Sequence, residues 1–142
     1  ERELELSKFC LLDLRAPDLL SPQDSGTFEY LVFGGILGDH PPRDRTGELR
    51  EAVTQGGDER RRHLGTLQMT TDSAVLVSKL ILDGQPMEEM KFVDEPEIQI
   101  SEQETQSLPF RHLADADGNA MLCPGLLDHL KEDGGELEMD NF

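Results

Sequence analysis

Two short, mainly apolar runs, each with one acidic residue, stand out near the start of the chain, at residues 9–14 and 28–33. Their length and residue types are those of buried strands, and each run ends at a glycine, a proline or a charged residue. Because apolar residues do not alternate with polar ones, we expect both faces of these strands to be covered, as in a parallel sheet. The turn-rich segment between them, residues 17–26, leaves room for a short helix.

The most helix-like segment begins at Thr70 and ends at Gly84. The side chains of Thr70, Thr71 and Asp72 carry oxygens that accept hydrogen bonds from the first free amides of a helix, and glycine is typical after a last turn. Since apolar residues then occupy nearly every face of the helix, we expect it to be buried.

Shorter elements complete an α/β pattern, which predicts a mostly parallel sheet with helices on both faces. The sequence predicts them in this order: a helix at 47–53 capped by Thr46, an exposed loop at 54–59, a strand at 91–93, a bend at 94–96, an extended segment at 97–100, strands at 108–113 and 120–123 around a turn at 115–118, and a helix from Pro124 that ends near Lys131. We expect one domain over residues 1–132 and an acidic, disordered tail over residues 133–142.

Charge limits the class of partner. The 142 residues include 13 Lys plus Arg against 30 Asp plus Glu, a formal net charge of -17, and more than half of the acidic residues lie from Asp83 onward. Such a surface repels nucleic acid and anionic lipid and favours a basic protein partner, and it favours a monomer because two acidic copies repel each other. The basic residues between Arg43 and Arg62 are the one place that suits an anion, although residues 60–62 are also typical of a solvated charge run.

Cysteine, histidine and apolar content indicate a soluble, cytoplasmic protein without a metal. Cys10 and Cys123 lie far apart, so we expect two buried free thiols and a reducing compartment. The four histidines show no metal-ligand spacing, so no metal site is expected. No apolar stretch approaches the roughly 20 residues of a membrane span, and the first residues lack a signal-peptide pattern.

The first candidate for chemistry, called the first loop below, is FGGILGDHPPRDRT at residues 33–46, directly after an apolar run. Its glycines allow the backbone to approach a ligand closely, and α/β folds bind ligands at the carboxyl ends of parallel strands. The string matches neither GxGxxG nor GxxxxGK[ST]. A glycine-rich turn alone is also typical of a structural turn, but the charged Asp39, Arg43, Asp44 and Arg45 behind it favour a functional site.

The second candidate, called the second loop below, is LGTLQMTTD at residues 64–72. Helix capping alone explains residues 70–72. Capping does not require Gly65, Gln68 or Met69, which suit a loop around an apolar, heteroaromatic ligand.

The two loops together resemble a known family. FGGILGDHPPRDRT and RRHLGTLQMTTDSAV, supported by CLLDLRA, KFVDEPEI and LPFRHL in the same order, resemble the SPOUT class of methyltransferases and, within it, the eukaryotic enzymes that methylate an arginine of a small-subunit ribosomal protein. The resemblance covers residues 9–133 and implies a C-terminal trefoil knot, an exception to the rule that chains do not knot. It implies S-adenosylmethionine as the cofactor, held by the following residues: Gly34, Gly35, Leu37 and Gly38 of the first loop, and Leu64, Gly65, Gln68, Met69 and Thr70 of the second.

The resemblance also implies transfer of a methyl group to an arginine of a basic ribosomal protein. Such a transfer requires a positioned nucleophile, and a guanidinium must lose a proton. The candidate residues are Asp39 and Asp44, beside Arg43 and Arg45, for orienting the guanidinium and accepting its proton, and Asp94 and Glu95 for holding the incoming cation. Each of these acids is equally consistent with a solvated loop charge or a loop ion pair.

Two features depart from the family. Its further N-terminal α/β section is missing, which is expected to leave one sheet edge or face uncovered, and residues 54–60 are polar where relatives have an apolar strand. Two other functions stay open. One is RNA methylation, because most enzymes of this class act on RNA, and the other is a noncatalytic acidic interaction module that has kept the fold and lost the pocket.

Overall fold

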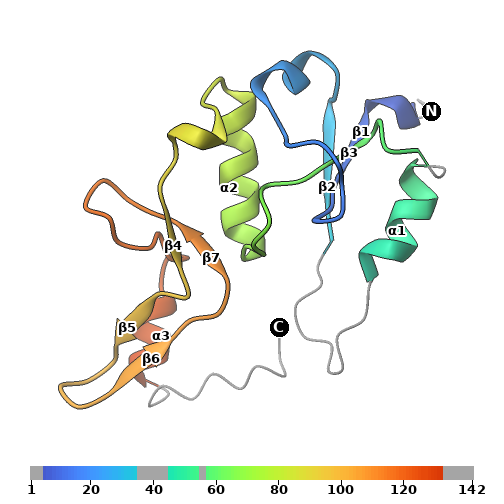
Figure 1. Cartoon of the computed structure of the whole chain (residues 1–142). Coiled ribbons are helices and arrows are strands. Elements are labelled where there is room, and N and C mark those ends of the chain that lie inside the picture. Colours follow the sequence, from blue (N-terminus) through green and yellow to red (C-terminus); the bar gives the residue numbers. More distant parts are fainter. Residues whose placement is uncertain (1–4, 35–44, 55–56, 133–142) are drawn as a thin grey trace.

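A three-stranded parallel sheet forms the first half of the protein. The computed structural model describes residues 5–34, 45–54 and 57–132 (Figure 1). The strands, in the order β2-β1-β3, are β1 (Phe9–Leu12), β2 (Tyr30–Phe33) and β3 (Arg61–Arg62). Cys10 and Leu11 on the central strand have no exposed surface, whereas every β2 residue keeps some exposure. The predicted parallel pairing of the first two apolar runs is confirmed, and burial on both faces holds for the centre of β1.

The strand β3 lies where the sequence predicts only loop and solvated charge. Arg61 and Arg62 pair with Leu11 and Leu12 of β1, and Arg61 is only 9% exposed. Arg62 donates to Asp24 over 3.2 Å and lies over the ring of Phe28. The expectation of a solvated arginine run is therefore wrong for these two residues, because nearby carboxylates and an aromatic ring accommodate their guanidinium groups.

Helix α1 (Arg45–Thr54) packs against β1. The predicted helix is confirmed, but it begins one residue before Thr46, so Thr46 lies inside the helix and is not its N-cap. At the other end, the Thr54 hydroxyl donates to the carbonyl oxygen of Arg50 over 2.5 Å. The helix thus ends at Thr54, one residue past the predicted end.

Helix α2 (Thr71–Leu82) follows the second loop. Thr70 is its N-cap, as predicted, but the Thr70 hydroxyl donates to the Ser73 hydroxyl over 2.8 Å rather than accepting from a helix amide. Val77 and Ile81 are fully buried, whereas Val75 is 47% exposed. The expectation of a helix buried all round is therefore wrong, since the short 3₁₀ helix η2 (Pro22–Gly26) and the strand β7 cover only part of its surface.

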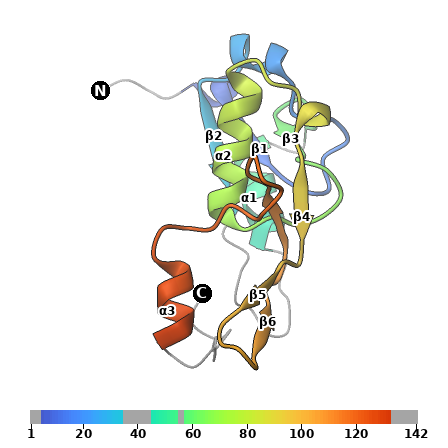
Figure 2. The ribbon, with the colours of Figure 1, turned by 90° about the vertical axis from the view of Figure 1, so that its left-hand side faces the viewer.

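The second half of the protein is built from antiparallel ribbons. Strand β4 (Phe92–Asp94) pairs with β7 (Arg111–Leu113), and β5 (Glu97–Gln99) pairs with β6 (Thr105–Ser107). The expectation of a mostly parallel sheet thus holds for the first half alone, and β6 was not predicted. Figure 2 shows β5, β6 and α3 (Leu126–Glu132) extending away from the part that contains the parallel sheet and α2.

The predicted turn after β7 is present, but the strand after it is not. Asp115 accepts the Asp117 amide over 2.9 Å, and one antiparallel bridge joins Ala114 to Ala120. Residues 121–123 form no strand, and α3 begins after Pro124 rather than at it. Cys123 is an exposed free thiol, so the expectation of two buried thiols holds only for Cys10.

The hydrophobic core connects the two halves of the protein. Its buried residues come from the connector after β1, the second loop, α2 and β7: Leu20, Leu64, Met69, Val77, Ile81 and Leu113. Two members belong to the second loop, so packing in the core fixes where this loop lies.

No helix in the described ranges combines the length and the apolarity needed to cross a membrane.

Candidate active site

A pocket lies at the carboxyl ends of β1 and β2, where ligands of parallel sheets bind. Its volume is about 170 Å³, and we call it the strand-end pocket. The end of β1, the end of β2, the second loop and the first turns of α2 line it, with the following residues: Leu12, Asp13, Leu14, Arg15, Phe33, Gly34, Leu64, Leu67, Gln68, Met69, Thr71 and Ala74.

Four of the predicted cofactor residues meet in this pocket although they lie far apart in the sequence: Gly34, Leu64, Gln68 and Met69. Two others, Gly65 and Thr70, do not line it. Gly65 has a φ of +95°, a conformation that glycine adopts readily, and the Cβ of any other residue there would lie 3.2 Å from the Met87 Cε. Gly65 thus has a structural role in the turn and Thr70 has one as the N-cap of α2, and their assignment to the cofactor stays a prediction.

The remaining first-loop candidates lie outside the described residues: Gly35, Leu37, Gly38, Asp39, Arg43 and Asp44. Arg45 is the first residue of α1. The residues that flank this segment are described. Gly34, before it, lines the strand-end pocket, and α1, after it, packs against β1.

The sequence analysis missed the pocket residues at the end of β1. Leu14 and Leu67 line the pocket and are 46% and 44% exposed, so the described pocket carries uncovered apolar surface. Asp13 and Arg15 contribute polar atoms beside them. The position of CLLDLRA at the end of a predicted parallel strand is the signal that identifies this segment.

Asp13 is the buried centre of an ion-pair network. Its Oδ2 accepts from Arg50 Nε on α1 over 2.5 Å and from Arg61 Nη1 on β3 over 3.0 Å, while its Oδ1 accepts the Arg15 amide over 3.0 Å. Arg61 also pairs with Asp58. Burial alone raises the pKa of Asp13, but the hydrogen bonds from Arg50, Arg15 and Arg61 outweigh it and hold the pKa below its ordinary value. The network therefore keeps an ionised carboxylate at the pocket and fixes α1 and β3 to β1.

The acidic pair predicted to hold a cation lies at the end of β4, with Asp94 as its last residue and Glu95 directly after it. Asp94 accepts two hydrogen bonds from Arg111, 2.6 Å from Nε and 3.2 Å from Nη2. Arg111 holds the pKa of Asp94 below its ordinary value. Glu95, next along the chain, has a φ of +46°, an uncommon angle for a residue other than glycine. The structure thus places Asp94 in an ion pair within the protein.

No group of three or more His, Cys, Asp or Glu side chains within residues 5–34, 45–54 and 57–132 has an arrangement that could hold a metal ion. The chemistry that the strand-end pocket supports is the binding of a partly apolar molecule beside a buried carboxylate.

Comparison with known sequences decides the family. Residues 1–136 match the family described as protein arginine N-methyltransferase SFM1-like. The chain belongs to the SFM1-like family. It is 46% identical, over 139 residues, to the protein arginine N-methyltransferase SFM1 of Saccharomyces cerevisiae, an alignment that covers 95% of this chain and 64% of the yeast protein. This SFM1-like chain thus spans just under two thirds of that relative.

Solved structures of the yeast SFM1 protein share the mixed α/β fold. The crystal structure of the yeast arginine methyltransferase SFM1 complexed with SAM matches with a TM-score of 0.80 at 45% identity, covering 94% of this chain and 60% of that chain. The complex with SAH matches with a TM-score of 0.77 at 46% identity, covering 90% and 61%. The fold of this SFM1-like chain is therefore that of the corresponding part of the yeast protein.

Proposed function

We propose that this protein is an S-adenosylmethionine-dependent methyltransferase that modifies an arginine side chain of a basic ribosomal protein. The observation that carries the proposal is the meeting of Gly34, Leu64, Gln68 and Met69 in one pocket at the ends of parallel strands. Membership of the SFM1-like family and the SAM and SAH complexes of the yeast structures support it.

The described pocket residues fit the cofactor chemically. Leu14 and Leu67 offer exposed apolar surface to an adenosine group, and the half-buried Gln68 offers an amide that can both donate and accept. Asp13 lines the same pocket, and its carboxylate is held ionised by Arg50 and Arg61, so it fixes the shape of the pocket wall rather than offering a free charge.

When bound, S-adenosylmethionine supplies an electrophilic methyl group. The protein then has to orient a guanidinium nitrogen in line with that group and to remove one proton from it. We assign these tasks to Asp39 and Asp44, and we place Arg43 and Arg45 beside them as cations that can pair with these carboxylates. Their place in the sequence supports this, since they lie between the pocket residue Gly34 and helix α1. Glu95 is the acid we assign to the incoming cation, because Asp94 pairs with Arg111.

We further assign the chain to the SPOUT class, with a trefoil knot in its C-terminal part and helices on both faces of the sheet. We assign residues 1–132 to one domain, and Gly35, Leu37 and Gly38 to cofactor binding. The sequence strings of both loops support these assignments. A monomer fits the net charge of -17, which opposes self-association, and the cytoplasm fits two cysteines that are both free thiols.

The substrate assignment rests on charge and family together. A net charge of -17 disfavours the phosphate contacts that supply most nonspecific affinity for nucleic acid, and it favours a cationic protein. Ribosomes whose proteins lack the arginine methylation are therefore the substrate with which to test the full-length protein.

A radiolabelled methyl-transfer assay on such ribosomes tests the function. After the reaction, RNA is separated from protein and the labelled fraction is hydrolysed. We expect label in methylarginine. Label in RNA or in lysine contradicts the arginine assignment, and absence of label with a folded protein that binds no cofactor favours the noncatalytic module. Asp39→Asn and Asp44→Asn are expected to lower transfer and leave cofactor binding within about twofold, because an amide keeps the shape but does not accept the proton.

A further inference from the structure

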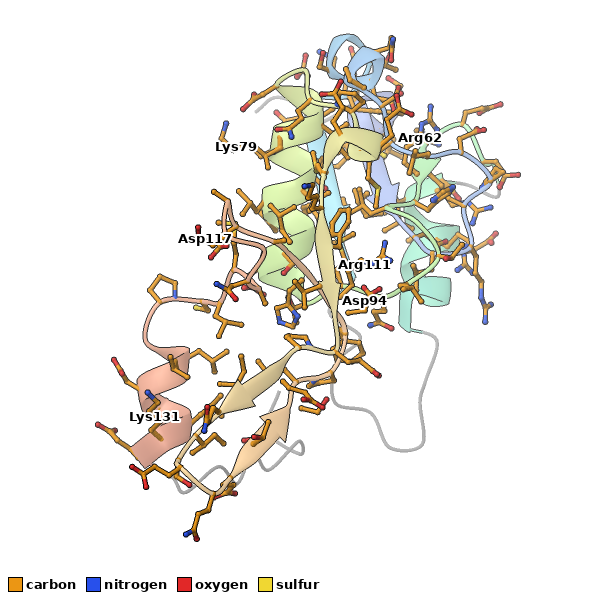
Figure 3. All side chains as sticks on the ribbon, turned by 60° about the vertical axis from the view of Figure 1, so that its left-hand side comes forward. Arg62, Lys79, Asp94, Arg111, Asp117 and Lys131 are labelled. Carbon is orange, nitrogen blue, oxygen red and sulfur yellow. The ribbon has the colours of Figure 1, made fainter. Side chains whose placement is uncertain are left out.

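Arg111 on β7 makes an unusually complete set of contacts for a partly exposed arginine. Its guanidinium pairs with both carboxylate oxygens of Asp94, and its Cζ lies 4.9 Å from the centroid of the Phe92 ring. Figure 3 shows Asp94 and Arg111 side by side at the end of the β4–β7 ribbon. The planar guanidinium is thus fixed in position and orientation by one strand, β4.

The same residue also holds the second loop. The Arg111 backbone amide donates to the Gln68 carbonyl oxygen over 2.9 Å, and Met69 forms a parallel bridge with Arg111. The Arg111 Nη1 lies 4.0 Å from the place where a Cβ would stand on Gly65. Arg111 therefore contacts Gln68 and Met69 of the loop, both of which line the strand-end pocket, whereas Arg111 itself does not.

The backbone on both sides of this pair is strained. Glu95, directly after Asp94, has a φ of +46°, and Phe110, directly before Arg111, has a φ of +70°. The Glu95 amide donates to the Phe110 carbonyl oxygen over 3.1 Å. Non-glycine residues keep such angles only where the surrounding structure enforces them, and such strain concentrates at functional sites.

We propose that Asp94 and Arg111 form a positioning clamp that holds the second loop in the shape that binds the cofactor. This inference rests on the proposed function. Both residues act through Gln68 and Met69, so they are positioning residues, and Asp94 serves the reaction by orienting Arg111 rather than by binding substrate. Loss of the clamp weakens cofactor binding and leaves the transfer step itself unchanged.

Two variants and one matched control test the clamp in the full-length protein. Asp94→Asn removes the charge that orients Arg111, and Arg111→Lys keeps the backbone amide and the charge but loses the two-point geometry. The control is Asp83→Asn, which breaks the exposed ion pair, 2.6 Å long, between Lys79 on α2 and its C-cap Asp83. Hydrogen exchange of residues 64–70 is measured without cofactor, and KM for S-adenosylmethionine and kcat are measured separately.

For Asp94→Asn we expect the hydrogen-exchange rate of residues 64–70 and the KM for S-adenosylmethionine each to rise about fivefold, because one exposed ion pair contributes about that much. We expect kcat to stay within about twofold of the wild-type value. Arg111→Lys is expected to fall between Asp94→Asn and wild type. Exchange and KM equal to those of Asp83→Asn overturn the clamp, as does a loss confined to kcat. The exchange measurement decides the matter even if the wild-type protein binds no S-adenosylmethionine, an outcome that overturns the proposed function instead.

Discussion

Glu95 donates its backbone amide to the carbonyl oxygen of Phe110 over 3.1 Å, and both residues hold a positive φ. The hydrogen bond joins the end of β4 to the start of β7, at the point where the chain leaves one ribbon for the next. Arg111, the residue after Phe110, donates its own backbone amide to the Gln68 carbonyl oxygen of the second loop.

Replacing Glu95 by glycine is expected to stabilise the protein relative to alanine at the same place. Glycine accepts a φ of +46° without the steric cost that any Cβ brings, so Glu95→Gly is predicted to be about 1 kcal/mol more stable than Glu95→Ala. The free energy of unfolding in urea measures this. The matched pair is Glu97→Gly and Glu97→Ala within β5, where the order is expected to reverse because glycine weakens a strand. The same order at both positions contradicts the strain.

The Asp13 network is expected to contribute strongly to stability. The Asp13 side chain is only 3% exposed, and Asp13→Asn leaves Arg50 and Arg61 with less compensation for their charge. We predict a loss of about 3 kcal/mol in the free energy of unfolding, as for other buried pairs that lose one partner. The control Asp83→Asn, at an exposed pair, is expected to change it by less than about 0.5 kcal/mol. Equal losses in the two variants contradict the network.

The same network sets a dependence on pH. The pKa of Asp13 is lowered in the folded protein from its ordinary value of 3.8, so its contribution is complete above that pH and is lost as the pH falls through the lower, folded pKa. The difference in unfolding free energy between wild type and Asp13→Asn is therefore expected to shrink below pH 3.8. A difference that stays constant down to pH 2 contradicts the lowered pKa.

The two thiols are expected to react at very different rates. Cys123 is exposed, whereas burial raises the pKa of the Cys10 thiol to about 12. Because the thiolate is the reacting form, an aromatic disulfide reagent at pH 8 is expected to modify one thiol in the native protein and both after denaturation. Cys123→Ser is the matched control, and it is expected to leave no fast-reacting thiol. Fast reaction of Cys10 in this variant contradicts its burial.

Leu67 and Leu19 provide a matched test of the pocket, since both are 44% exposed but only Leu67 lines it. Leu67→Ala removes apolar surface that the adenosine group would cover, and it is expected to raise the Kd for S-adenosylmethionine about tenfold. Leu19→Ala is expected to change it by less than about twofold. Calorimetric titration measures both, and equal effects contradict the proposed place of the cofactor.

Much of the site could be predicted because its parts follow from local rules. A continuous apolar run predicts β1, and the carboxyl end of a parallel strand predicts a ligand site at the glycines that begin with Gly34. The cofactor residues of the second loop follow instead from the resemblance of its sequence to a known family. Leu14 and Asp13 follow from the strand-end rule, but a single carboxylate between apolar residues gives no local sign of its two arginine partners. These come from residues far away in the sequence, at Arg50 and Arg61.

Other parts could not be predicted because tertiary contacts override local preference. Two arginines form β3 since Asp13, Asp58 and Asp24 neutralise them, and β propensity alone argues against a strand there. Strand β6 is polar, and its residues alternate only between exposed and half-buried, so periodicity gives no signal. Gly65 holds a positive φ, a requirement of the backbone that the sequence pattern does not reveal.

Binding of S-adenosylmethionine tests the central claim most directly. The full-length protein, shown to be folded by circular dichroism, is titrated with the compound in a calorimeter at neutral pH. The account predicts saturable binding to one site, with a Kd below about 1 mM, as is usual for enzyme substrates. A folded protein that binds neither S-adenosylmethionine nor its demethylated product at millimolar concentration would contradict the account.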